Sequence, residues 1–155
     1  MKSIRILTFL SLAVFSAITA LAHDVNAPLN EKQIQYLTTY EVLRAALAAD
    51  DLAAAQKVGP LMIEQAGPDA SADKHLQKRV EAAGKLAKAA TLAEAREAFK
   101  ILSKSAVHLA TNKKEYYVAH CPMVPDEAGD WVQTTLKISN PYMGKAMPTC
   151  GTIEK

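Results

Sequence analysis

The chain has 155 residues, 50% of them hydrophobic, with two cysteines, five methionines and one tryptophan. Its formal net charge is only +2 at pH 7. A chain this close to neutral gives no electrostatic reason to expect a nucleic acid or an anionic membrane surface as its partner.

The first 22 residues have the pattern of a secretory signal peptide. Lys2 and Arg5 form a short positive region, an apolar run covers 6–20, and Ala20-Leu21-Ala22 is a small-x-small cleavage pattern. The apolar run is shorter than the roughly 20 residues that a spanning helix needs. We therefore expect cleavage after Ala22, export to the periplasm and no membrane span in the mature chain.

Residues 23–155 are expected to form one helical domain. Removing Lys2 and Arg5 from the 18 basic residues balances the 16 acidic ones, so the mature chain is neutral. The remaining 133 residues, which are the 155 less the first 22, suffice for a single core. We divide the domain into helices over 31–112 and a C-terminal segment over 116–151.

Four stretches of 31–112 carry apolar side chains at helical spacing. The first stretch begins after the predicted N-cap Asn30 and has one apolar face, made of Tyr36, Tyr40, Leu43 and Leu47. Asp51 is the predicted cap of the second stretch, which contains Gly59-Pro60. An internal proline bends or breaks a helix, and the sequence does not decide between these outcomes.

The third and fourth stretches begin at predicted caps as well. Ser71 is the expected cap of the third, and Thr91-Leu-Ala-Glu94 has the form of a capping box for the fourth. The apolar seam of the fourth consists of Leu92, Ala95, Phe99, Leu102, Ala106 and Leu109. The predicted fold is all-α: an up-down four-helix bundle with a largely irregular C-terminal segment packed on it.

The C-terminal segment concentrates the chemistry of the chain. Short extended pieces are expected at 115–120 and 131–138, and Asn140-Pro141 predicts the start of a helical turn. Imidazole, thiol and thioether side chains gather here: His120, Cys121, Met123, Met143, Met147 and Cys150. Because sulfur donors select Cu(I), and Ag(I) by the same logic, these six residues form a candidate soft-metal site. Trp131 could shield such an ion or contact it through its ring.

One other interpretation remains open. An exported protein with two cysteines commonly forms a disulfide, and a Cys121–Cys150 bond would remove both thiolates as ligands. The segment would then be a disulfide-stapled, metal-free interaction module of the cell envelope. We expect no enzymatic activity, because the chain has no nucleophile elbow, phosphate loop or HExxH pattern.

The motifs Cys-Pro-Met, a following Trp and Asn-Pro-Tyr…Cys-Gly resemble a domain family of unknown function found in exported bacterial proteins. The same domain occurs at the C-terminus of CusB-type adaptors of copper/silver efflux pumps. Asp50-Asp51 and Phe99-x-x-Leu102-Ser103 also resemble that family. The resemblance extends to these positions of the segment: Cys121, Met123, Trp131, Asn140, Pro141, Tyr142, Gly144, Met147, Cys150 and Gly151.

This resemblance implies a helical domain that handles heavy metals. Asn140, Tyr142 and Trp131 would support the site. The implied function is a periplasmic Cu(I)- or Ag(I)-binding protein that buffers or delivers the ion. A heavy-metal efflux adaptor or another copper protein of the envelope would be its partner.

Overall fold

The computed structural model describes residues 27–125 and 129–154. The predicted signal peptide lies outside the described residues. The elements, in chain order, are α1 (Glu31–Ala48), α2 (Leu52–Ala66), η1 (Pro68–Ser71), α3 (Lys74–Ala87), α4 (Leu92–Ala110), β1 (Tyr117–His120), β2 (Asp130–Gln133), η2 (Gly144–Ala146) and β3 (Thr152–Glu154). Within these ranges, no helix combines the length and apolar character needed to cross a membrane.

Polar side chains at the predicted positions cap three of the four helices. Asn30 accepts a hydrogen bond from the backbone N–H of Gln33, and the Gln33 side chain accepts one from the backbone N–H of Asn30. The side chains of Asp51 and Thr91 cap α2 and α4 by accepting the backbone N–H of the third residue ahead. The predicted capping box of α4 is incomplete, because the Glu94 side chain accepts the N–H of Ala90 and not that of Thr91. These bonds satisfy backbone donors that have no partner inside the helix.

The predicted cap of the third helix was wrong. Ser71 ends the short 3-10 helix η1, and Asp73 is the N-cap of α3, where its carboxylate accepts from the N–H groups of His75 and Leu76. Serine and aspartate are both good N-caps. Because the 3-10 helix η1 includes Ser71, α3 begins later and Asp73 is its N-cap.

The α2 helix continues through Pro60. Pro60 is exposed, whereas Gly59 is buried against α3, and a Cβ at Gly59 would collide with the backbone of Ala83. Gly59 therefore allows α2 and α3 to approach closely. The packing of α2 against α3 beside Pro60 offsets the destabilising effect of a proline inside a helix.

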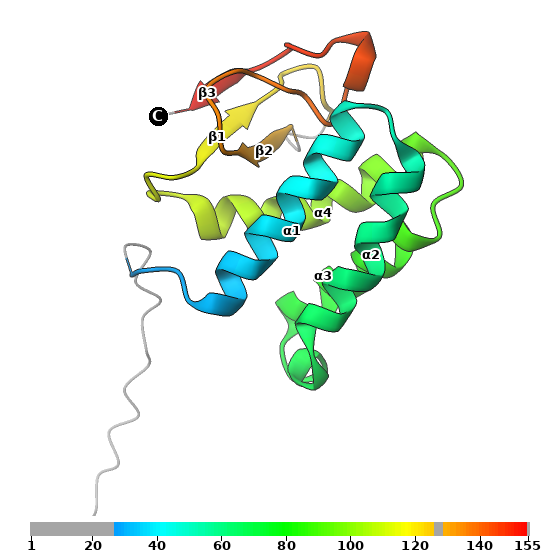
Figure 1. The fold of residues 1–155 in the computed structure, drawn as a ribbon, viewed down its shortest axis with the longest axis vertical. Helices are drawn as coiled ribbons and strands as arrows, with labels where there is room; N and C mark the ends of the chain where they lie inside the picture. The colour runs from blue at the N-terminus through cyan, green and yellow to red at the C-terminus, as the bar shows by residue number, and fades with distance from the viewer. Residues whose placement is uncertain (1–26, 126–128, 155) are drawn as a thin grey trace, which may run out of the picture.

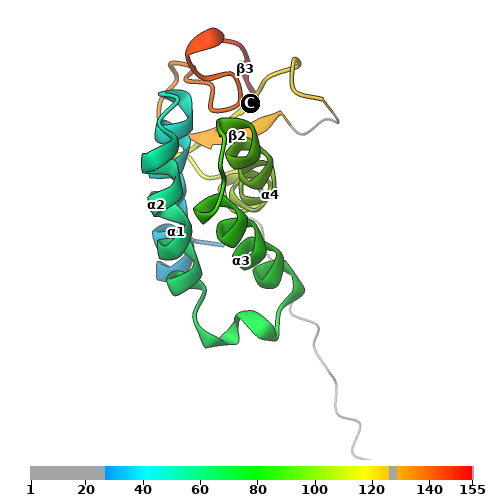
Figure 2. The same ribbon diagram turned by 90° about the vertical axis from the view of Figure 1, so that its right-hand side faces the viewer.

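Four helices make up most of the structure, consistent with a helical bundle. In Figures 1 and 2 the first three helices follow one another up and down, and α4 runs across them. The core between them is Ala-rich but contains stacked aromatic rings: the rings of Tyr40 and Phe99 have centroids 5.2 Å apart. Phe99 also meets the ring of Tyr142 edge-on at 5.3 Å, so the C-terminal segment contributes to the same core.

The C-terminal part of the chain adds a small sheet to the helices. The sheet is three-stranded and antiparallel, in the order β2-β1-β3, which corrects the purely α class. Most of the described residues between these strands have no regular structure, as predicted for the segment. The expected extended piece 115–120 contains β1, and the expected piece 131–138 overlaps β2 only at its start. No sequence pattern indicates β3, because it has three residues and is defined by its hydrogen bonds to β1.

Candidate functional site

The two cysteines come together in the C-terminal segment. Cys121 directly follows β1, and its backbone N–H donates to the Gly129 carbonyl at 3.0 Å. Cys150 lies just before β3. The two Sγ atoms are 2.7 Å apart and are free thiols in the structure. This separation is within reach of the predicted disulfide, which stays a prediction.

The pair lies at the edge of the core. Cys121 is fully buried and Cys150 is partly exposed, so solvent reaches the pair from the Cys150 side. The hydrogen bond with the Cys121 sulfur raises the pKa of the Cys150 thiol. Because a thiolate is the form that binds a metal, an ion entering here must displace protons.

Asn140 positions the chain on the Cys150 side. Its Oδ1 accepts from the N–H groups of Tyr142 and Met143 at 2.8 and 3.0 Å, which makes it the cap that the sequence predicted. Its Nδ2 donates to the Cys150 carbonyl at 2.7 Å. Asn140 is fully buried, so this one side chain fixes both the turn after Pro141 and the backbone of Cys150.

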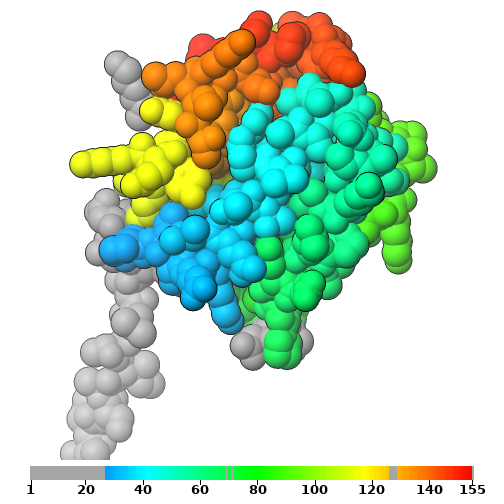
Figure 3. Space-filling model, in the orientation of Figure 1, coloured from blue at the N-terminus to red at the C-terminus, as the bar shows by residue number. Residues whose placement is uncertain are grey.

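An ion pair between Asp50, in the turn after α1, and Arg96 on α4 also holds the turn after Pro141. Asp50 lies 2.6 Å from Arg96, and its second carboxylate oxygen accepts the backbone N–H of Lys145 at 3.1 Å. Arg96 also donates to the carbonyl of Pro141 at 2.9 Å. These bonds, that of Arg96 first, lower the pKa of Asp50. Figure 3 shows the segment lying over this end of α1.

The methionines differ in their surroundings. Met143 is half-buried and packs against the core, whereas Met123 and Met147 are 60% and 43% exposed. Neither exposed thioether belongs to the apolar core, so an ion in solution can reach both sulfur atoms.

His120 forms a pair with an acidic side chain. Its Nδ1 lies 2.6 Å from Oδ1 of Asp130, the residue directly opposite on β2. The six predicted donors thus include one close sulfur pair, two exposed thioethers, one half-buried thioether and a histidine bound to a carboxylate. Sequence reasoning missed Asp130, because only the strand register brings it to His120.

Trp131 belongs to the core. It is fully buried, its Nε1 donates to Oε1 of Gln133 at 3.0 Å, and its ring meets Tyr142 edge-on at 6.2 Å. A Cβ at Gly151 would collide with the same ring. Trp131 therefore supports the segment by packing, with its one polar atom already hydrogen-bonded.

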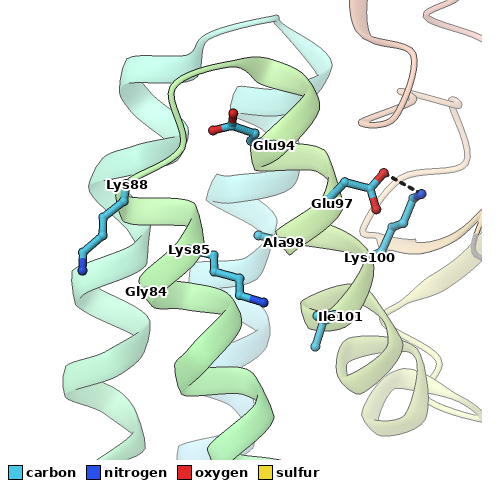
Figure 4. Close-up of a pocket in the computed structure, with 8 residues that line it drawn as sticks. All are labelled: Gly84, Lys85, Lys88, Glu94, Glu97, Ala98, Lys100 and Ile101. Carbon is cyan, nitrogen blue, oxygen red and sulfur yellow. Dashed lines mark hydrogen bonds and ion pairs between the residues drawn. The ribbon is translucent and has the colours of Figure 1, made fainter.

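A groove between α3 and α4 lies away from these residues. Figure 4 shows its lining, which includes Lys85, Lys88, Glu94, Glu97 and Lys100. Glu97 is paired with Lys100 at 2.7 Å, and Glu94 accepts the N–H of Ala90. The groove is lined by side chains of both charges and both of its carboxylates already have partners, so it suggests no particular ligand.

Comparison with known proteins places the chain in a family. No curated protein and no solved structure matches it. A family model described as "Protein of unknown function (DUF3347)" matches residues 36–116, which is just over half of the chain. The match spans most of α1 and all of α2 to α4, and it ends before β1 and the cysteine motifs. The protein therefore belongs to the DUF3347 family.

Proposed function

We propose that this chain is a periplasmic soft-metal-binding protein that takes Cu(I) or Ag(I) at the Cys121–Cys150 pair. The observation that carries the proposal is the 2.7 Å separation of the two sulfur atoms, at a place that is open to solvent on the Cys150 side. To hold one ion between them, the two thiols would have to lose their protons and their sulfur atoms would have to move apart. The ion would be buffered there, or passed on, in heavy-metal efflux or homeostasis.

The donor chemistry supports a soft ion over a hard one. Thiolates and thioethers favour Cu(I), whereas thioethers add little to a zinc site. Met123 and Met147 lie exposed in the same segment and suit the capture and release of an ion on its way to the thiols. His120 is hydrogen-bonded to Asp130 on the neighbouring strand, and the proposed Cu(I) site uses only sulfur donors.

The partner in this proposal is a heavy-metal efflux adaptor or another copper protein of the envelope. The Cys-Pro-Met and Asn-Pro-Tyr…Cys-Gly motifs, which resemble the domain of copper/silver efflux adaptors, support this choice. The exposed thioethers would be the first contact in transfer between the two proteins.

Competitive titration of Cu(I) against a chromogenic chelator, with the protein kept reduced, tests the ligand set. We expect Cys121→Ser/Cys150→Ser to lose at least about a hundredfold in affinity, or roughly 2.7 kcal/mol. Met123→Ala/Met147→Ala should lose about tenfold. Met62→Leu is the matched control, because Met62 is buried in the helical core. Wild-type affinity in the double cysteine variant would contradict the proposal.

A second candidate is the disulfide-stapled interaction module without metal. It is favoured by the same short sulfur separation and by the full burial of Cys121. The bond would close a loop of about 30 residues and stabilise the fold by roughly 3–4 kcal/mol in the chain-entropy model. A reduced protein that binds no Cu(I), and that unfolds more easily than the oxidised one, would establish this alternative.

A further inference from the structure

A second group of metal-binding side chains lies on the sheet, with harder donors than the sulfur pair. His120, Asp130 and Glu154 each offer one ligand atom, and these three atoms lie within 4.8 Å of one another. They come from β1, β2 and β3, one from each strand.

The strand register explains why the three side chains meet. His120 is directly opposite Asp130 on one side and Thr152 on the other, and Glu154 is opposite Val118, two residues before His120. Side chains two apart on a strand, and those directly opposite on its neighbours, project from the same face. The imidazole is therefore flanked by a carboxylate from each neighbouring strand.

The backbone beneath this group is fixed to the helices. The carbonyl of Asp130 accepts hydrogen bonds from Ser103 on α4 at 2.7 Å and from Tyr142 at 2.6 Å. His120 and Asp130 are partly buried, with side chains 31% and 42% exposed. The ligand positions thus belong to a sheet with anchored strands, and solvent can still supply the remaining ligands of an ion.

We propose that His120, Asp130 and Glu154 bind a divalent first-row transition-metal ion, at a site separate from the sulfur pair. One imidazole with two carboxylates is a donor set for ions such as Zn²⁺, Ni²⁺ or Cu²⁺, and it does not suit Cu(I). The chain would then hold ions of two chemical classes in one segment. This inference does not depend on the proposed Cu(I) function.

The test uses Zn²⁺ as the probe and the Cys121→Ser/Cys150→Ser chain as the background, so that no thiolate can bind it. Isothermal titration should show one Zn²⁺ per chain, and the ring resonances of His120 should shift on titration. Glu154→Gln and Asp130→Asn, which preserve side-chain shape, should each weaken binding at least about tenfold. His75→Gln is the control, because His75 is exposed on α3.

Three results would overturn the proposal. They are the absence of one-to-one Zn²⁺ binding, unchanged affinity in Glu154→Gln, and Zn²⁺ binding that leaves the His120 ring resonances in place. Glu154 is exposed on an edge strand, so its substitution tests the site even if Asp130→Asn disturbs the fold. Because the cysteines are absent from this background, failure here leaves the Cu(I) proposal standing, and the reverse also holds.

Discussion

At the residue scale, Gly144 is a position that leaves no room for a side chain. Its φ is +53°, and a Cβ there would overlap the carboxylate of Asp50 and the guanidinium of Arg96. Any other residue would strain the backbone and also separate the ion pair that holds the turn after Pro141 on the helices. The glycine and the ion pair are therefore parts of one contact between α1, α4 and the C-terminal segment.

This contact predicts opposite effects for two glycine substitutions. Gly144→Ala should lower the free energy of unfolding by about 2–4 kcal/mol, the sum of a left-handed backbone penalty and a weakened charged hydrogen bond. Gly84→Ala is the matched control, since Gly84 lies within α3 with open space where a Cβ would go. It should raise stability by about 0.5–1 kcal/mol. Chemical denaturation measures both, and equal effects would contradict this account of Gly144.

The sequence predicts hydrogen bonds between residues that are close together in the chain, such as helix caps, but not contacts between distant residues. Asn30, Asp51, Thr91 and Asn140 are caps because their side chains reach N–H groups two or three residues ahead, which the sequence displays directly. The Asp50–Arg96 pair joins residues 46 positions apart and depends on how the helices pack. No local spacing could have revealed it.

At the element scale, β2 is an edge strand whose outer backbone groups form hydrogen bonds with side chains of the helices. Tyr40 on α1 accepts the N–H of Val132, and its hydroxyl shares a hydrogen bond of 2.7 Å with Ser103 on α4. Ser103 and Tyr142 donate to the Asp130 carbonyl on the same strand. These hydroxyl groups thus occupy backbone hydrogen-bonding positions of β2 with which another strand could otherwise pair.

Removing the Tyr40 hydroxyl should therefore loosen the sheet. Tyr40→Phe leaves the buried N–H of Val132 without this acceptor, and we expect a loss of about 1–2 kcal/mol in the free energy of unfolding. Hydrogen exchange should show faster exchange at Val132. Tyr117→Phe, on the half-buried β1 and outside this hydroxyl network, is the control. If Val132 exchanges as in the wild type, the helices do not secure this edge.

The sheet also shows what could not be predicted at this scale. Two extended pieces followed from β-favouring residues and prolines, but their pairing and the third strand depend on contacts between distant residues. The contacts of His120 with acidic side chains were missed for the same reason. The register places His120 beside Asp130 and Glu154, whereas proximity in sequence suggests only its neighbours Cys121 and Met123.

At the scale of the whole molecule, buried tyrosines join the helices to the C-terminal segment. Burial raises the pKa of Tyr36, Tyr40 and Tyr142 above the usual value of about 10. Tyr40 and Tyr142 both hydrogen-bond to β2 or to residues that hold it, and Tyr36 donates to the Leu102 carbonyl on α4. The fold therefore requires these hydroxyls to stay protonated.

This requirement predicts a loss of stability in alkali. Above about pH 10 the unfolded chain releases these protons while the folded chain retains them, so the free energy of unfolding falls as pH rises. Each tyrosine contributes up to about 1.4 kcal/mol per pH unit, and the contribution is fully present below pH 10. Urea denaturation between pH 8 and 11 should show this fall, with a shallower slope in Tyr40→Phe. Equal slopes in the two proteins would contradict the assignment.

Cu(I) binding by the protein in two redox states would show whether the two thiols hold a soft metal ion, as we propose. Cu(I) competition titrations would be run on the mature wild-type protein in its thiol-reduced form and in its oxidised form. We predict that the reduced protein binds one Cu(I) per chain and that oxidation of Cys121 and Cys150 weakens this binding by at least about a hundredfold. Equal binding by the two forms, or none by the reduced form, would contradict the claim.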